Sequence, residues 1–246
     1  MVKESEQLSN LPNTDKQEFD AFANRYDVLL NECIAASGEE SKYFTEYKIK
    51  DLAQAWQRTA KSSAESVPLL DFGAGIGASI PFIQKHFSNA QITCADVSRE
   101  SLALAERNHG NSAAYSLIEN NRLLLPDQAF DVVFAACVFH HIPPQEQPMM
   151  LKELQRVLRP GGFLMIYEHN PYNPIVNRVV QACPFDKNAI LIPSYVMKQR
   201  VAQAGFKNIR SRYRVFFPNS LKALRGIEAF LTWLPVGAQY YTIAEN

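Results

Sequence analysis

Residues 69–77 read Leu-Leu-Asp-Phe-Gly-Ala-Gly-Ile-Gly, and a helical pattern opens directly after them at Ala78. The apolar run predicts a strand, the alternating glycines a tight turn, and the following segment the start of a helix. Glycine suits such a turn because it allows a sharp bend and lets a ligand approach the backbone where a Cβ would block it. A helix start also offers free N–H groups and a positive dipole end to a polar or anionic ligand. This stretch therefore predicts a ligand-binding turn, and the alternative is a glycine-rich turn that binds nothing.

Two acids accompany this turn. Asp71 lies two residues before the first glycine, and Asp96 ends the next predicted strand. An acid in the second position can accept both hydroxyls of a ribose, in nicotinamide enzymes and methyltransferases alike. The dinucleotide fingerprint is G-x-G-x-x-G, whereas the spacing here is G-x-G-x-G with an acid before it. The resulting D-x-G-x-G-x-G form resembles the S-adenosylmethionine (SAM) site of the class I methyltransferases. A nicotinamide oxidoreductase is the disfavoured alternative, because no Tyr-x-x-x-Lys pair lies where a short-chain dehydrogenase needs one.

Length and composition narrow the class of protein. A chain of 246 residues with a hydrophobic fraction of 47% and no net charge fits one α/β domain with a large core. The neutral balance argues against a dedicated nucleic-acid-binding protein, so no DNA partner is expected. Residues 1–20 are polar, lack the apolar core of a signal peptide, and no stretch reaches bilayer-spanning length. We therefore expect a cytoplasmic protein, either a monomer or a homodimer.

The cysteines also indicate the compartment of the protein. Cys33, Cys94, Cys137 and Cys183 are far apart and form no C-x-x-C pair. Such spacing is typical of reduced, mostly buried thiols in a cytosolic protein. Neither a disulfide framework nor a bound metal ion is expected.

Apolar periodicity predicts alternating helices and strands. Helices are expected at 15–31, 41–60, 78–87, 99–108, 145–158, 194–204 and 221–234, with Ser98 as the N-cap of the fourth. After the first strand, strands are expected at 91–95, 113–117, 130–136, 163–167, 206–217 and 239–244. This order predicts a Rossmann-like, doubly wound α/β sheet of seven strands, mostly parallel with the last strand antiparallel.

The same pattern divides the chain into two parts. Residues 1–66 are expected to form an N-terminal helical cap. Residues 67–246 are expected to form the main domain, with an irregular insertion rich in Pro and Asn at about 168–193. Ligands of such sheets bind at the carboxyl ends of the parallel strands.

Three further motifs add to the resemblance. They are Leu-Pro-Asp-Gln-Ala-Phe-Asp at 125–131, the pair His140-His141, and Leu-Arg-Pro-Gly-Gly at 158–162. Together with the glycine turn they resemble the class I SAM-dependent methyltransferases over roughly residues 67–170, and most closely the branch of quinone-biosynthesis and other small-molecule enzymes. The resemblance implies SAM as cofactor, S-adenosylhomocysteine as product, and methyl transfer by in-line displacement to a small-molecule acceptor. The alternatives are an RNA or protein methyltransferase and a SAM-binding protein without catalysis.

The resemblance also implies roles for particular residues. Those expected to bind the cofactor are Asp71, Gly73, Ala74, Gly75 and Gly77 around the methionine end, Asp96 at the ribose, Val97 against the adenine, Glu119 and Asn120 at the adenine edge, and Cys137 along the methionine part through its backbone.

Candidates for acid–base chemistry follow the fourth and fifth strands. A base assists the transfer when the attacking group is a hydroxyl or an acidic carbon, and histidine titrates in the right range. The candidates are His141, placed slightly before His140, and the pair Glu168-His169. The equally weighted alternative is that these side chains cap a helix, pack under a loop or lie in a surface turn. Tyr172 and Tyr43 are candidates for the acceptor pocket, with core packing favoured for Tyr43.

A basic run follows the insertion. Residues 198–225 contain no Asp or Glu, and Arg210, Arg212 and Arg214 alternate, so that a strand would place them on one face. A solvated sheet face is favoured over a site for an anionic acceptor, an acidic lipid surface or RNA. The predicted helix 221–234, with Phe230 and Trp233, could lie on a membrane or form a dimer face, but packing in the core is favoured.

Overall fold

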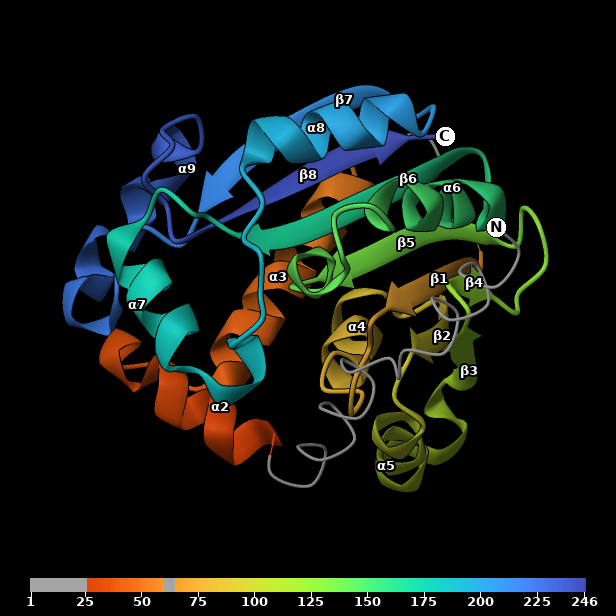
Figure 1. The fold of residues 1–246 in the computed structure, drawn as a ribbon, viewed down its shortest axis with the longest axis horizontal. Coiled ribbons are helices and arrows are strands. Elements are labelled where there is room, and N and C mark those ends of the chain that lie inside the picture. The colour runs from red at the N-terminus through yellow and green to blue at the C-terminus, as the bar shows by residue number, and fades with distance from the viewer. Residues whose placement is uncertain (1–25, 60–64) are drawn as a thin grey trace, which may run out of the picture.

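The computed structural model describes residues 26–59 and 65–246 and is built on one mixed sheet (Figure 1). The sheet has eight strands in the order β4-β3-β2-β1-β5-β6-β8-β7. Their bounds are β1 Val67–Phe72, β2 Ala90–Asp96, β3 Ala114–Glu119, β4 Arg122–Leu123, β5 Phe130–Ala136, β6 Leu158–His169, β7 Lys207–Arg214 and β8 Gln239–Glu245. Strands β1, β2, β3, β5 and β6 are parallel, and β8 runs antiparallel to both β6 and β7. The predicted doubly wound α/β class with an antiparallel last strand is confirmed.

The predicted number of seven strands was one too few. Asn120 and Asn121 both have positive φ, at 51° and 57°, and turn the chain back on itself after β3. Arg122 then pairs with Glu119 in a two-residue hairpin, a turn for which Asn is well suited. The short strand β4 results, and its two residues are too few for a periodic pattern to reveal.

Helices cover both faces of the sheet. They are α2 Tyr26–Ile34, α3 Ser41–Trp56, α4 Ile80–His86, α5 Arg99–His109, α6 Gln147–Val157, α7 Pro174–Ala182, α8 Ser194–Gln203 and α9 Glu228–Leu231. One core layer joins the sheet to α6 and α8, through side chains such as Leu154 and Val201. The other joins it to α3, α4 and α5, through side chains such as Leu52 and Ile83. Ser98 caps α5 as predicted, because its hydroxyl accepts the Ser101 N–H at 3.0 Å.

Helices α2 and α3 are the described part of the predicted N-terminal cap. The predicted helix 15–31 lies partly outside the described residues, and the described part continues to Ile34. Asp51 of α3 is buried and accepts two hydrogen bonds of 2.7 Å from the guanidinium of Arg214 in β7. Arg214 therefore ties the cap to the sheet edge. The expectation of a solvated face fails for this residue, while Arg210 and Arg212 are exposed.

The insertion is more ordered than expected. Asn173 accepts the N–H groups of Ile175 and Val176 at 3.0 and 3.1 Å, and Pro174 occupies the first turn of α7. Asparagine at the N-cap and proline in the first turn are helix-start signals, and they override the high content of Pro and Asn. The prediction of an irregular segment at 168–193 was therefore wrong for residues 174–182.

The predicted helix 221–234 differs in shape and in burial. A 3-10 helix spans Asn219–Ile227, and α9 follows it as a single short turn. Leu221, Leu224, Ile227, Phe230 and Trp233 are all exposed, so the favoured core packing is wrong. Arg225 and Glu228, and not these five apolar side chains, face the protein.

Two cysteines also contradict expectation. Cys33 of α2 and Cys183 after α7 form a disulfide with a Cα–Cα distance of 5.5 Å. They are 150 residues apart, so their spacing in the sequence gave no sign of the pairing. Cys94 and Cys137 are free thiols, as predicted. No helix among the described residues combines the length and apolar character needed to cross a bilayer.

Candidate active site

A cavity of about 710 Å³ lies at the carboxyl ends of β1, β2, β5 and β6, where a doubly wound sheet binds its ligands. Its wall combines the glycine turn after β1, the turns after β5 and β6, and parts of α2, α3 and the segment after α7. Predicted residues that line it are Asp71, Gly73, Ala74, Gly75, Asp96, Val97, Cys137, His140, His141 and His169.

The glycine turn has the predicted geometry. Gly73, Gly75 and Gly77 have positive φ of 72°, 54° and 78°. A Cβ on Gly73 would lie 2.3 Å from a methyl of Val138, whereas a Cβ on Gly75 would meet nothing within 4 Å and would point into open space. Gly73 is thus needed for packing, while Gly75 keeps the cavity wall bare beside the backbone, as a ligand lying against that backbone requires.

Asp71 and Asp96 hold the turn in place. The Ser79 hydroxyl donates to the buried Asp71, and burial raises the pKa of this carboxyl to about 6. Asp96 accepts the N–H groups of Gly75 and Ser98, each at 2.8 Å, and so connects the turn to the start of α5. Both carboxylates therefore have fixed positions in the cavity wall.

The shape and chemistry of this half of the cavity fit SAM. Asp96 presents a carboxylate where a ribose would lie, and Val97 and Ile118 supply apolar surface beside it for an adenine ring. Next to Asp96, which accepts the Gly75 N–H, the bare backbone at Gly75 leaves open space for another part of the ligand. The wall is formed by Ile118 and Asn121 instead of the predicted Glu119 and Asn120, because the hairpin turns those two away. Glu119 lies 3.7 Å from Arg99 in an exposed ion pair.

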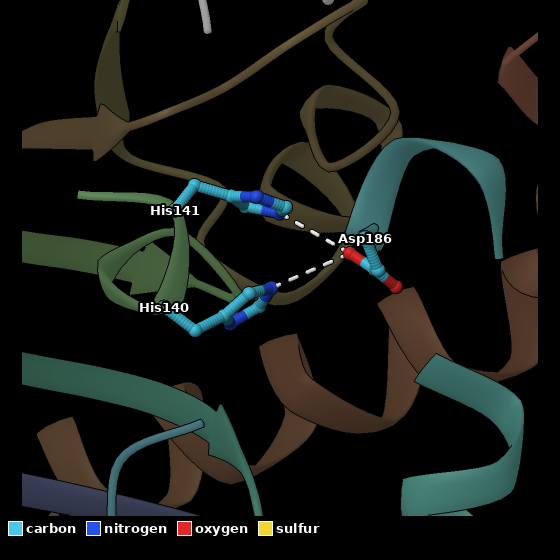
Figure 2. A group of neighbouring side chains, drawn as sticks. All are labelled: His140, His141 and Asp186. Atoms are coloured by element: carbon cyan, nitrogen blue, oxygen red, sulfur yellow. Dashed lines mark ion pairs between the residues drawn. The ribbon is translucent and has the colours of Figure 1, made fainter. Parts of the chain in front are cut away.

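The other half of the cavity contains a cluster of histidines and carboxylates. Nδ1 of His140 lies 2.5 Å from Oε2 of Glu168, and the other oxygen of Glu168 accepts the N–H groups of Val138 and Phe139. Nε2 of His140 and of His141 lie 3.6 and 3.3 Å from the same oxygen of Asp186, between the two rings in Figure 2. The structure thus brings together the residues after both strands, as predicted, and adds Asp186.

The two neighbouring histidines differ in charge. Burial alone would lower the pKa of His140, but the charges of Glu168 and Asp186 outweigh it and raise that pKa to about 10. Burial lowers the pKa of His141, and the positive charge on His140 lowers it further, against the opposing effect of Asp186. At neutral pH His140 is therefore an imidazolium between two carboxylates, and His141 is a neutral imidazole on the cavity wall.

The same side chains have the geometry of a cation site. The ligand atoms of His140, His141 and Asp186 lie within 4.8 Å of one another. Two imidazoles and a carboxylate suit zinc or a divalent transition metal, and Glu168 would orient His140 from behind. The sequence predicted no metal, since Asp186 lies in the segment read as irregular.

A third group of side chains surrounds Cys137. Its backbone has a positive φ of 60°, and Nζ of Lys48 lies 3.2 Å from its sulfur. Burial would raise the pKa of this thiol, but Lys48 and His169 outweigh it and lower the pKa to about 6. Cys137 thus carries thiolate character in the cavity wall, beyond the backbone role that was predicted. Lys48 was missed because α3 lies outside the stretch that resembles the family.

The two predicted acceptor-pocket tyrosines lie elsewhere. Tyr43 stacks under the guanidinium of Arg225, 4.7 Å from its ring centroid, and Tyr172 is exposed on the surface. Neither belongs to the cavity wall, whose aromatic side chains include Phe44 and Phe185. Tyr43 was misplaced because α3 turns the following residue, Phe44, toward the cavity.

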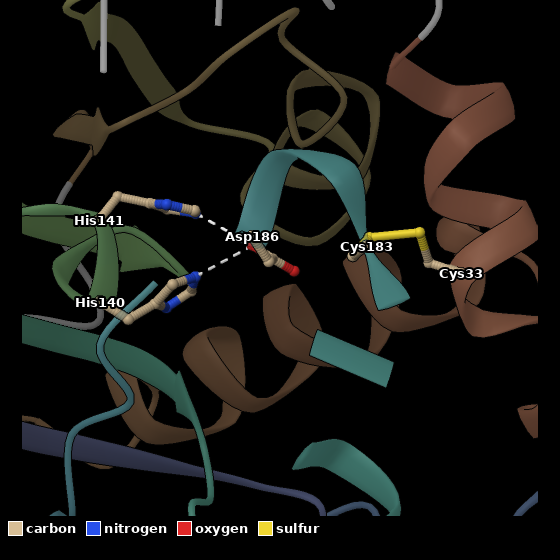
Figure 3. Close-up of a disulfide and its surroundings, with 5 residues drawn as sticks. All are labelled: Cys33, His140, His141, Cys183 and Asp186. Atoms are coloured by element: carbon tan, nitrogen blue, oxygen red, sulfur yellow. Dashed lines mark ion pairs between the residues drawn. A yellow bond between two sulfur atoms is a disulfide. The ribbon is translucent and has the colours of Figure 1, made fainter. Parts of the chain in front are cut away.

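The disulfide joins the two segments that form the roof of the cavity, namely α2 and the turn at residues 183–186. Leu30 and Ile34 of α2 line the cavity together with Phe185 and Asp186. Cys183 lies on the same turn as Asp186, whose N–H donates to the Cys183 carbonyl. Figure 3 shows the disulfide next to this turn. The bond to Cys33 therefore holds α2 against the segment that positions Asp186.

Comparison with known proteins agrees with this geometry. The family model described as "Methyltransferase domain" matches residues 70–166. The chain is 27% identical to the ubiquinone/menaquinone biosynthesis C-methyltransferase UbiE of Hahella chejuensis, over 71% of this chain and 70% of that protein. It is 28% identical to the methyltransferase GfsG of Streptomyces halstedii, over 63% of this chain and 61% of that protein. A SAM-dependent methyltransferase from Archaeoglobus fulgidus has the same fold, with a TM-score of 0.62 at 15% identity over 84% of this chain and 95% of that chain.

Fold, cavity and comparisons define a class I SAM-dependent methyltransferase. Within that class the chain is similar to small-molecule enzymes that include quinone-biosynthesis C-methyltransferases. The predicted family, enzyme class and cofactor are thereby confirmed, and the nicotinamide alternative is set aside.

Proposed function

We propose that this enzyme transfers the methyl group of SAM to a small-molecule acceptor bound beside His141, which takes a proton from the attacking group. The observation that carries the proposal is the position of His141 on the wall of the same cavity as the glycine turn, 3.3 Å from Asp186, where burial lowers its pKa. Relatives named for acting on quinone precursors and on thiols methylate an acidic carbon or a thiol, and such groups attack best when deprotonated.

In this proposal the first half of the cavity binds and aligns. The backbone at Gly73–Gly75 and the carboxylates of Asp71 and Asp96 hold the cofactor, which supplies a methyl group on a positively charged sulfur. Leu30, Ile34 and Phe185 exclude water from above. Alignment and exclusion of water are the main contributions that a protein makes to an in-line displacement.

The second half manages the proton. In this proposal the imidazole of His141 takes the proton, and Asp186, with an oxygen 3.3 Å from Nε2, holds the ring in position. Asp186 then stabilises the imidazolium that forms, as the carboxylate does in other His–Asp pairs. His140 acts as a positioning residue, because its charge holds Asp186 and Glu168 in place.

Replacing His141 tests this role. We expect His141→Ala to lower turnover by about 10²- to 10⁴-fold, the usual contribution of a general base, without changing the affinity for S-adenosylhomocysteine. The assay follows transfer of a labelled methyl group from SAM to a naphthoquinol, a phenol and an alkyl thiol. His86→Ala is the matched control, since His86 lies at the end of α4 outside the cavity wall and should leave turnover unchanged.

Two outcomes would contradict the proposal. Unchanged turnover in His141→Ala would remove this residue as the base. Loss of turnover on dialysis against EDTA, restored by one divalent metal, would assign the cluster to a metal ion instead.

A further inference from the structure

Six apolar side chains between β7 and β8 recur at every third position and all are exposed. This apolar stripe consists of Leu221, Leu224, Ile227, Phe230, Trp233 and Val236. A 3-10 helix has three residues per turn, so Leu224 and Ile227 lie on one side of the segment Asn219–Ile227, which is kinked at Leu221. Phe230 and Trp233 are exposed by 77% and 69%, which is unusual for side chains of this size and apolar character.

Polar contacts hold this segment with its apolar side outward. The guanidinium of Arg225 stacks over Tyr43 and pairs with Glu39 at 2.8 Å. Glu228 is buried, where it accepts the hydroxyl of Tyr47 at 2.8 Å and the N–H of Phe216 at 3.0 Å. An amphipathic segment of a soluble protein normally faces its apolar side inward, and this one has the opposite polarity. The stripe is therefore fixed in an exposed position by specific contacts.

The surroundings of the stripe add further apolar surface. Ten of the thirteen large apolar side chains exposed among the described residues lie between 172 and 236. Tyr172 and Ile175 extend the stripe, because Asn173 donates to the Val236 carbonyl at 2.8 Å. Figure 1 shows α7 and α9 at the same end of the molecule, the end toward which the arrowhead of β6 points.

The exposed charges that residues 171–238 contribute all have one sign. The acids of residues 171–238 are Asp186 and Glu228, and both are buried. The exposed charged residues are Arg178, Lys187, Lys198, Lys207, Arg210, Arg212 and Lys222. Lys222 lies in the stripe segment and Arg178 in the adjoining α7, so a two-fold contact through the stripe would bring positive charges of both copies close together, which disfavours a symmetric dimer.

We propose that the apolar stripe docks the enzyme on a lipid bilayer that contains anionic lipid. Aromatic and aliphatic side chains next to lysine and arginine are the composition of segments that lie in a membrane interface, and the positive charges are drawn to anionic headgroups. The stripe adjoins the cavity, because His169 lines the cavity and the next residue, Asn170, donates to the carbonyls of Pro235 and Gly237. Docking through the stripe places this edge of the sheet next to the bilayer.

Vesicle binding by the full chain tests the proposal. We expect the protein to float with vesicles of phosphatidylcholine mixed with phosphatidylglycerol, and to float much less with phosphatidylcholine alone. Phe230→Ser combined with Trp233→Ser should lower the partition constant by at least about tenfold, since two large side chains no longer enter the interface. Leu124→Ser combined with Met149→Ser is the matched control, because it removes two exposed apolar side chains outside the stripe and should leave binding unchanged. Unchanged affinity for S-adenosylhomocysteine in both variants checks that they are folded.

Trp233 gives a second readout. Trp56 is buried and Trp233 exposed, so a blue shift of emission on adding vesicles, with quenching by lipids brominated on the acyl chain, would report entry of Trp233 into the bilayer. Absence of flotation with either vesicle, or equal flotation of the stripe variant and the wild type, would overturn the proposal. A concentration-dependent dimer that the stripe variant abolishes, without vesicle binding, would show that a second copy covers the stripe.

Discussion

At the scale of single residues, two adjacent histidines take opposite parts in the site. His140 is fully buried between Glu168 and Asp186 and carries a charge, whereas His141 shares only Asp186 and stays neutral. Both rings line the cavity, but only His140 also lies against Glu168 of β6, at the short 3-10 turn Phe139–His141. One ring thus provides structure and the other is available for chemistry.

The charged pair predicts a pH-dependent stability. Glu168→Gln should lower the free energy of unfolding by about 3–5 kcal/mol near neutral pH, because it leaves the buried charge on His140 with one partner fewer. The pKa of His140 is raised from 6.5 to about 10, so its contribution is fully present below about pH 6.5 and is lost as the pH rises toward 10.

Urea unfolding of the wild type and of Glu168→Gln across this pH range measures the effect. The difference in unfolding free energy between the two proteins should shrink as the pH rises. A difference that stays constant would show that Glu168 stabilises the fold without a charge on His140.

The sequence predicted much of the site at this scale. Asp71, Gly73, Gly75, Asp96 and the two histidines lie in short motifs next to strand ends, where chemistry and local structure are read together. Asp186 and Lys48 come from segments with no such pattern, and they reach the cavity only through tertiary folding. Residues of that kind cannot be recognised from their sequence neighbours.

At the scale of elements, the roof of the cavity depends on a bond between distant segments. The disulfide joins α2 to the turn that carries Phe185 and Asp186, and both of its ends lie next to residues that line the cavity. A bond that closes a long loop restricts the unfolded chain, which makes the folded state relatively more stable.

Reduction of this bond gives a second prediction. Cys33→Ser should lower the free energy of unfolding by about 2–4 kcal/mol, the usual contribution of a native disulfide, and thermal denaturation should show a lower midpoint. Dithiothreitol should lower the midpoint of the wild type to that of the variant and should leave the variant unchanged. A wild type that is insensitive to dithiothreitol would contradict the disulfide.

Elements were predicted well where periodicity alone decides them. Strand β5 spans the predicted residues 130–136, and α5 and α8 agree within one residue at each end. The segment 219–236 was misjudged because an apolar stripe has the same spacing whether it faces the core or the solvent. The contacts of Arg225 and Glu228 decide its orientation, and their partners Glu39, Tyr43 and Tyr47 lie far away in the sequence.

At the scale of the whole molecule, all the functional features lie at the same end of the sheet, where the parallel strands have their carboxyl ends. The glycine turn follows β1, the histidine cluster lies after β5 and at the end of β6, and the apolar stripe follows β7. The glycine turn and the histidine cluster line the cavity. Parallel strands place the segments after them at one edge, so distant parts of the chain meet there. The central claim is that the half of this cavity formed by the glycine turn binds SAM.

Calorimetric titration with SAM, S-adenosylhomocysteine and NADH tests that claim most directly. The account predicts binding of the first two and none of NADH. Asp96→Ala should weaken binding by about tenfold or more, since it removes hydrogen bonds from a carboxylate to the ribose. Glu119→Ala is the matched control, an acid at the end of the neighbouring strand but outside the cavity wall, and should bind as the wild type does. Binding of NADH instead, or equal affinity in the wild type and Asp96→Ala, would contradict the account.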